Sequence, residues 1–133
     1  MGSVVYEDRG ERLFNGPEVL LVCAEVFGGL PTPRKPSEIV NGEVRTCEGI
    51  SVDREFRLGA HRALDMCEQA GGPEEIVACI LQDRSPSCGA GLIYDGTFSG
   101  TLTAGNGVFV DLLLRHGYRV IPACEFDPSM LEQ

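Results

Sequence analysis

The stretch ILQDRSPSCGAG, residues 80–91, places two hydroxyl groups and a thiol directly after an apolar run. Ser85, Ser87 and Cys88 stand there beside a proline and a glycine, the residue types that stiffen and tighten turns. The two hydroxyls can cap the turn through hydrogen bonds, or they can meet a substrate. A thiol in a polar turn is a poor apolar filler. We therefore interpret this stretch as a candidate functional turn.

A second apolar run ends in CAEVFGG, which carries Cys23 and Glu25. The two residues are separated by one position, so their side chains share one side of an extended chain. A carboxylate beside a thiolate can act as a general acid or base, and it can also be a solvated residue at the start of a loop. Cys23 can equally be a small buried hydrophobe.

Thiolates that come singly from separate loops suit either an iron–sulfur cluster or a nucleophilic site, and their spacing does not separate the two. The sequence has no CxxC pair, which argues against a zinc ribbon or a thioredoxin-like motif. His61 and His116 stand on predicted helices, and we expect neither to be catalytic. We interpret the other four cysteines as structural: Cys47, Cys67, Cys79 and Cys124.

The elements that position these groups follow an α/β pattern. Continuous apolar runs predict buried strands, apolar periodicity predicts helices, and Asp-Gly and Ser-Gly pairs indicate a loop or an irregular hairpin. The predicted strands are residues 18–26, 75–83 and 118–124, the helices 51–72 and 106–117, the irregular hairpin 93–102, and a proline-rich loop 28–40. Alternating strands and helices predict a mostly parallel sheet, whose ligands lie beyond the carboxyl ends of the strands. Cys23 and Cys88 both stand at such ends.

The composition of the chain limits the classes of ligand and partner that we expect. The chain has 133 residues, enough for a single domain with one core, and a formal net charge of −9. Its eleven basic residues are scattered, so we expect a small-molecule ligand and no nucleic acid. The apolar runs are too short to cross a membrane, and the opening residues do not resemble a secretory signal. We expect a cytoplasmic protein whose six cysteines are thiols.

Three blocks of the sequence closely resemble a known bacterial family. The blocks are CAEVFGGLPTPRKPSEIV, DRSPSCGAGLIYDGTFSG and GNGVFVDLLLRHGYRVI, and the resemblance extends from about residue 5 to residue 120. The family has long been catalogued as a domain of unknown function, and its characterised members are thiouracil desulfidases. The resemblance implies a compact, single-domain, Rossmann-like α/β fold over residues 1–133.

The resemblance also implies a cofactor and residue roles. Family members hold a 4Fe–4S cluster by three cysteines and leave one iron open for the sulfur of a thiolated substrate. By motif position, Cys23 and Cys88 match two ligands, Glu25 matches the acid/base glutamate, and Ser85 matches the active-site serine. To substrate binding we assign Arg34, Ser87 and Asp95. The expected reaction replaces the sulfur of a thiolated nucleobase, such as thiouracil, with oxygen and releases sulfide.

The start of the chain departs from the family pattern. The family opens with a strand and a block like CLLGxxVRYDGG, whose first cysteine is the third ligand, and MGSVVYEDRG aligns with the tail of that block. We therefore expect the first strand and the third ligand to be missing, either because the chain is truncated at its N-terminus or because it has lost the ligand, and we favour truncation. Cys47 follows the proline-rich loop, where the family carries no ligand, and we do not expect it to substitute.

Two alternative functions stay open on the sequence. The missing ligand fits a non-catalytic binding or sensor domain on the same scaffold, without an intact cluster. An enzyme that uses Cys88 as a nucleophile together with Ser85 is a third hypothesis, but no histidine stands near them in sequence as a base.

Overall fold

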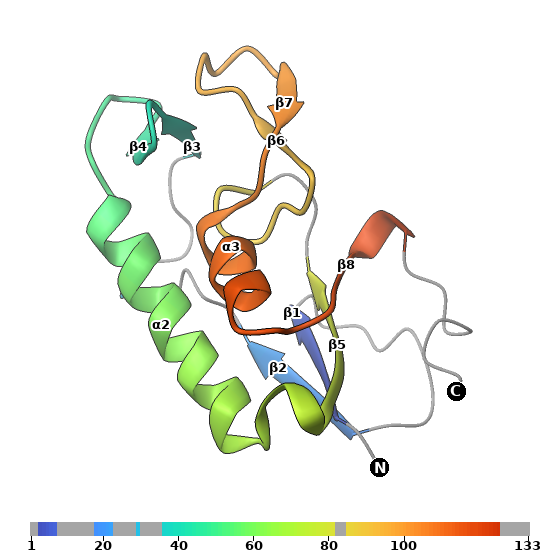
Figure 1. Cartoon of the computed structure of the whole chain (residues 1–133). Helices are drawn as coiled ribbons and strands as arrows, with labels where there is room; N and C mark the ends of the chain where they lie inside the picture. Colours follow the sequence, from blue (N-terminus) through green and yellow to red (C-terminus); the bar gives the residue numbers. More distant parts are fainter. Residues whose placement is uncertain (1–2, 8–17, 23–28, 30–35, 82–84, 126–133) are drawn as a thin grey trace.

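The computed structural model describes residues 3–7, 18–22, 29, 36–81 and 85–125 (Figure 1). Four strands form one parallel sheet in the order β2-β1-β5-β8. They are β1 (Ser3–Glu7), β2 (Glu18–Val22), β5 (Ile76–Leu81) and β8 (Val120–Pro122). The sheet and the helices between its strands confirm the predicted α/β class.

The position of β1 corrects the expectation that the chain lacks a first strand. Residues 3–7 pair in parallel with β2 on one side and with β5 on the other, with Val4 aligned to Val19 and to Ala78. The segment SVVYE carries β-branched and aromatic residues in its middle, which favours extended backbone. A place between two strands also gives hydrogen-bond partners to both of its edges.

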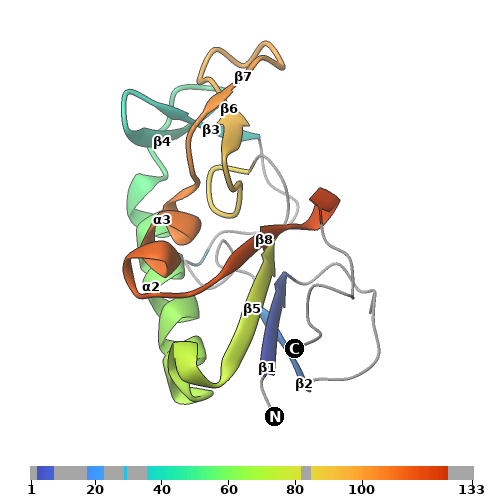
Figure 2. The ribbon, with the colours of Figure 1, turned by 45° about the vertical axis from the view of Figure 1, so that its right-hand side comes forward.

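Two helices pack side by side on the same face of the sheet (Figure 2). Helix α2 (Asp53–Gln69) buries the apolar face predicted from its periodicity, including Phe56, Ala60 and Cys67. Helix α3 (Val108–Arg115) adds further apolar side chains to the same core. No helix in the described ranges is long and apolar enough to cross a membrane.

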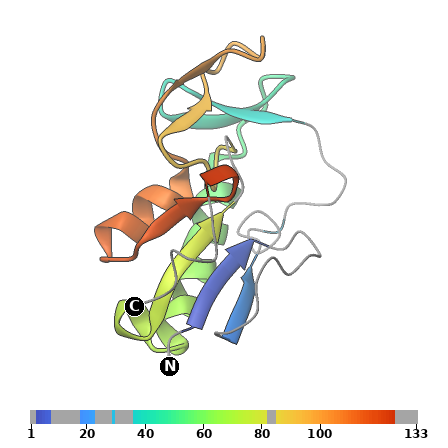
Figure 3. The same cartoon turned by 90° about the vertical axis from the view of Figure 1, so that its right-hand side faces the viewer.

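Two antiparallel hairpins lie beyond the ends toward which the strands of the sheet point (Figures 1 and 3). One joins β6 (Leu92–Tyr94) and β7 (Leu102–Ala104), as predicted for the Asp-Gly stretch. The other joins β3 (Ser37–Val40) and β4 (Glu43–Thr46).

The β3–β4 hairpin corrects the prediction of a loop over residues 28–40, because residues 37–40 form a strand. Its turn is Asn41-Gly42, with φ of +50° and +81°. Left-handed backbone at both turn positions suits the twist of a two-residue hairpin, and an Asn-Gly pair between apolar residues is its sequence signal. Two short hairpins therefore stand over the edge of the sheet where a ligand is expected.

Candidate functional site

The two hairpins and the turn after β5 line an open pocket of about 540 Å³. Its volume lies in the range typical of small-molecule sites. Among the described residues, the turn contributes Ser85 and Pro86. The β3–β4 hairpin contributes Glu38 and Cys47, and the β6–β7 hairpin contributes Tyr94 and Phe98.

Ser85 is both a cap of its own turn and part of the pocket wall. Its Oγ accepts hydrogen bonds from the N–H of Cys88 at 2.7 Å and from the N–H of Ser87 at 3.3 Å. Its carbonyl accepts the N–H of Gly89 at 2.9 Å. Because two N–H groups already point at the oxygen, the hydroxyl meets a ligand chiefly as a donor.

The structure separates the two serines of this turn. Ser85 lines the pocket, whereas Ser87 is 1% exposed and is not part of the described lining. The Oγ of Ser87 accepts a hydrogen bond from the thiol of Cys88, with the two heavy atoms 3.7 Å apart. Cys88 is also buried, at 3% exposure, so its described surroundings are the turn and the core behind the pocket. The predicted roles of Ser87 and Cys88 stay predictions.

Helix α3 fixes the position of this turn. The first helical N–H groups reach back to it: Val108 donates to the carbonyl of Pro86 at 2.7 Å and Phe109 to that of Ser87 at 2.9 Å. A Cβ at Gly107 would lie 2.4 Å from the carbonyl carbon and oxygen of Ser87. Only glycine allows this approach, so the packing of α3 positions the residues on either side of Ser87.

Asp95 begins the tip of the β6–β7 hairpin. Its Oδ1 accepts hydrogen bonds from the N–H and the hydroxyl of Thr97, and these bonds hold the pKa of the exposed carboxyl below its usual value. Asp95 is outside the described pocket lining, and its predicted role in substrate binding stays a prediction. Cys23, Glu25 and Arg34, the other predicted site residues, lie outside the described residues.

Two of the remaining cysteines are structural, as predicted. Cys67 on α2 and Cys79 on β5 are fully buried. The hydrogen bond between them and their burial raise the pKa of the Cys79 thiol, which keeps it protonated. Cys47 differs from the prediction, because its side chain is exposed and it lines the pocket with Ser85.

The sequence reasoning missed the hairpin side of the pocket. Glu38, Tyr94 and Phe98 line it together with Cys47. The Asn-Gly pair that ends β3 was the available signal for a hairpin, but nothing local in the sequence indicates that β3 meets the residue 95–100 loop. That contact joins segments about 60 positions apart, and only the tertiary fold brings them together.

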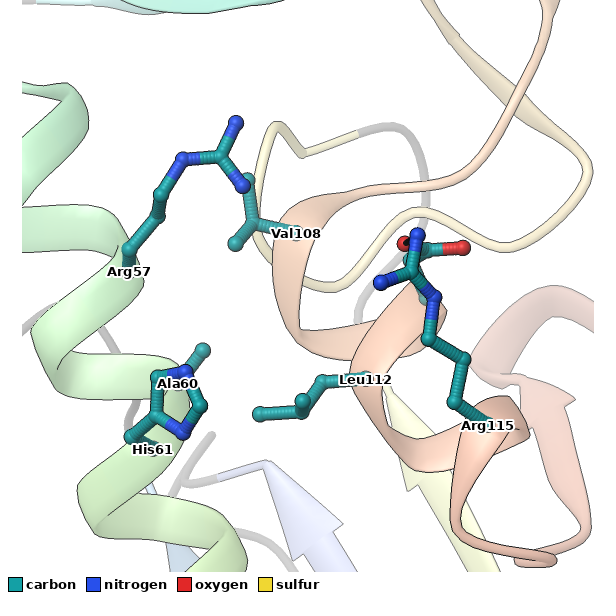
Figure 4. A pocket seen from close by; sticks show the side chains of 7 residues that line it. Arg57, Ala60, His61, Val108, Leu112 and Arg115 are labelled. Atoms are coloured by element: carbon teal, nitrogen blue, oxygen red, sulfur yellow. Dashed lines mark ion pairs between the residues drawn. The ribbon is translucent and has the colours of Figure 1, made fainter.

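A second, smaller pocket of about 90 Å³ lies between α2 and α3 (Figure 4). Its lining includes Arg57, His61 and Arg115. Arg57 pairs with Asp53 and Arg115 with Asp111, each one helical turn away. None of the predicted site residues lines this cleft, so we assign it no function.

The described residues alone do not provide a ligand set for a metal. No group of three or more His, Cys, Asp or Glu side chains is placed to hold one within the described ranges. Of the two predicted ligands, Cys88 lies within the described ranges. Its thiol is of the type that binds iron, and hydrogen bonds within its own turn hold it where the chain leaves β5. The other predicted ligand, Cys23, lies outside.

The chain matches a known protein family. A family model described as 2-thiouracil desulfurase matches residues 3–125. A curated relative, the uncharacterized protein YbbK of Bacillus subtilis (strain 168), is 35% identical over 136 residues, which cover 95% of this chain and 87% of the relative.

A solved structure has the same fold. It is described as the [4Fe-4S]-dependent thiouracil desulfidase TudS (DUF523Vcz), and it is 42% identical to this chain. The two structures superpose with a TM-score of 0.75, over 82% of this chain and 70% of that one.

Proposed function

The chain belongs to the 2-thiouracil desulfurase family, and from this premise we propose that it removes sulfur from 2-thiouracil or a similar small thiocarbonyl. One observation carries the proposal: the Ser85 hydroxyl lines an open pocket with two aromatic side chains, beyond the carboxyl end of β5. A parallel sheet places its ligands at this edge. The solved relative, described as a thiouracil desulfidase and 42% identical, supports the same reaction class.

The reaction is a hydrolysis of a carbon–sulfur double bond. Water adds to the carbon that bears the sulfur, a C–O bond forms, and the C–S bond breaks. The products are the oxo compound and hydrogen sulfide. The oxidation states of carbon and sulfur do not change, so the reaction needs no external reductant or oxidant.

Within this reaction, Ser85 orients and Glu25 moves protons. The Ser85 oxygen is already held by the N–H groups of Ser87 and Cys88, so its hydrogen is available to a ring heteroatom or to the attacking water. Glu25 takes a proton from the water and returns one to the leaving sulfur. Arg34 and Asp95 complete the proposed substrate contacts, whereas the buried Ser87 supports the turn through its contact with the Cys88 thiol.

A 4Fe–4S cluster is the proposed cofactor. Cys23 and Cys88 would hold it, and they supply two of the three thiolates that the family resemblance implies. When bound, a cluster with one open iron supplies a Lewis acid that accepts the sulfur. The net charge of −9 favours a free base over a thiolated RNA as substrate, and we propose a cytoplasmic location.

The test is anaerobic reconstitution with iron and sulfide of the protein expressed from its gene, including any codons in frame before Met1. Bound iron and sulfide release from 2-thiouracil are measured for the unaltered protein, for Cys88→Ser and for Cys124→Ser, an exposed control. We expect about four irons per chain in the unaltered protein and the control, and loss of both iron and turnover in Cys88→Ser.

Each other outcome contradicts a specific part of the proposal. Iron-loaded protein that releases no sulfide contradicts the desulfidase activity. Full turnover without iron indicates a cysteine nucleophile instead. Protein that takes up no iron and releases no sulfide indicates a binding domain.

A further inference from the structure

Glu38 on β3 is a buried carboxylate whose partners in the described chain are main-chain groups. The residue as a whole is 8% exposed. Its Oε1 accepts hydrogen bonds from the N–H of Gly96 at 2.9 Å and from the N–H of Phe98 at 3.1 Å. A buried carboxylate is retained at a cost unless hydrogen bonds compensate it. Here the compensation comes from a loop 58 to 60 positions away.

The loop that Glu38 bonds, around residues 96–98, has an unfavourable backbone conformation. Phe98 has φ of +57°, in the left-handed region that a bulky side chain rarely adopts. Such a conformation persists where the surroundings enforce it, often at ligand sites. Gly96 has φ of +91°, and a Cβ there would lie 2.5 Å from the carbonyl oxygen of Ile39. The loop therefore lies directly against β3, and Glu38 bonds it on both sides of Thr97.

The residues that this contact positions are the aromatic part of the pocket. Tyr94 and Phe98 line it with Ser85, and Glu38 is part of the same lining. A flat heteroaromatic ring is recognised by stacking or edge contacts with aromatic side chains. The backbone conformation of Phe98 determines where its ring lies. Because the N–H of Phe98 donates a hydrogen bond to Glu38, this carboxylate helps to hold that conformation.

We propose that Glu38 is a positioning residue that holds Phe98 in its left-handed conformation and so forms, with Tyr94, an aromatic subsite for a planar heteroaromatic thiocarbonyl. This inference rests on the proposed function for its substrate class. It makes ring recognition depend on a carboxylate that acts through the backbone of Phe98. The pocket then selects cyclic, planar thiocarbonyls over acyclic ones.

The test compares four forms of the reconstituted protein: unaltered, Glu38→Ala, Glu38→Gln and Glu43→Ala. Glu43 is the matched control, because it lies on the neighbouring strand and its carboxylate bonds Ser51 and Arg45 outside the pocket. Amide hydrogen exchange is measured at Gly96 and Phe98, with Gly89 as internal reference. The Kd values of 2-thiouracil and of uracil, the same ring without the reacting sulfur, are measured alongside KM and kcat.

We expect Glu38→Ala to accelerate exchange at Gly96 and Phe98 by about tenfold or more while leaving Gly89 unchanged. We expect Kd and KM for the ring to rise by about tenfold, with kcat changed by less than about threefold. Glu38→Gln should preserve both properties, because its amide oxygen accepts the same two N–H groups. A merely structural role would lower the Tm without this rescue or this separation of KM from kcat.

A further variant keeps the test decisive if Glu38→Ala does not fold. Phe98→Gly removes the ring, while glycine adopts the positive φ without strain, so the fold is kept. We expect this variant to weaken ring binding by about tenfold and to leave the Tm unchanged or higher.

The proposal is overturned if Glu38→Ala leaves exchange at Gly96 and Phe98 unchanged, if exchange accelerates but Kd does not change, or if Phe98→Gly binds the ring normally. An unaltered protein that binds neither ring also overturns it. Normal ring binding without sulfide release contradicts the proposed reaction alone and leaves the role of Glu38 to be decided by Kd and exchange.

Discussion

At the scale of single residues, one hydroxyl links the turn to the pocket. Ser85 accepts two N–H groups from its own turn and lines the pocket from which it would meet a substrate. The same contacts also explain how one side chain satisfies both roles proposed for it on the sequence, as a turn cap and as a site residue. Its substitution therefore has two separable effects.

We predict that Ser85→Ala lowers kcat/KM for 2-thiouracil by about 100-fold, because a preorganised donor at the reacting group is lost. Its stability should fall by only about 1 kcal/mol, the usual effect of losing a capping oxygen. Steady-state sulfide release and urea unfolding measure the two effects, with Ser51→Ala, at an exposed serine outside the pocket, as control. Activity within about threefold of the unaltered protein would remove Ser85 from the mechanism.

Of the pocket lining, the local sequence predicted only the side formed by the turn after β5. Residue type and turn context pointed to the turn that carries Ser85 and Ser87, and only the family resemblance matched Ser85 to an active-site serine. The local sequence does not separate the two serines, because α3 positions the turn: its first N–H groups bond the carbonyls of Pro86 and Ser87. Glu38 and Cys47 carried no such local signal, and both line the pocket through a hairpin.

At the scale of elements, α3 packs closely against the Ser85 turn. A Cβ at Gly107 would meet backbone atoms of Ser87 and Cys88, which cannot move without the turn. We predict that Gly107→Ala destabilises the fold by roughly 1–3 kcal/mol and lowers turnover with it.

Gly105→Ala is the matched control, because the nearest atoms there are the end of the flexible Ile93 side chain. Thermal unfolding and sulfide release measure both variants. Equal stability of the two alanine variants would show that α3 does not fix the turn.

The start of α2 is fastened to the β3–β4 hairpin by Asp53. Burial acts to raise the pKa of this carboxyl, but hydrogen bonds from the Arg57 side chain and the Val44 N–H outweigh it and hold the pKa below its usual value. A depressed pKa contributes stability above the unfolded value, about 3.9, and that stability is lost as the pH falls through the folded value.

We therefore predict that Asp53→Ala is less stable than the unaltered protein by about 1–2 kcal/mol at pH 7, and that the difference shrinks as the pH falls below about 4. Urea unfolding at several pH values measures it. A deficit that stays constant down to pH 2 would mean that the charge of Asp53 does not contribute.

Periodicity predicted the elements better than their connections. The buried face of α2 and the apolar cores of β5 and β8 follow directly from the spacing of apolar residues. The strand β1 was not predicted, because the segment SVVYE resembles the tail of the family block that follows the family's first strand. The β3–β4 hairpin was not predicted, because the closely spaced Pro31, Pro33 and Pro36 favour an irregular loop over residues 28–40.

At the scale of the whole molecule, the fold gathers sequence-distant groups at one edge of a parallel sheet. Both hairpins lie there (Figure 3). Residues of both hairpins and of the turn after β5 line the pocket. The alternation of strands and helices predicts that ligands bind at this edge, and the structure has a pocket there. The pairing of the hairpins over it was not predictable, because it depends on contacts such as Glu38 with residues 96 and 98.

The measurement that tests the proposed function most directly follows the oxygen and sulfur atoms. The anaerobically reconstituted protein is incubated with 2-thiouracil in water enriched in heavy oxygen, without a reductant, and uracil and sulfide are quantified by mass spectrometry and a sulfide assay. A hydrolytic desulfidase releases one sulfide for each uracil formed and carries the heavy oxygen into the former thiocarbonyl position. Iron-loaded protein that forms no uracil, or uracil whose new oxygen does not come from water, would contradict it.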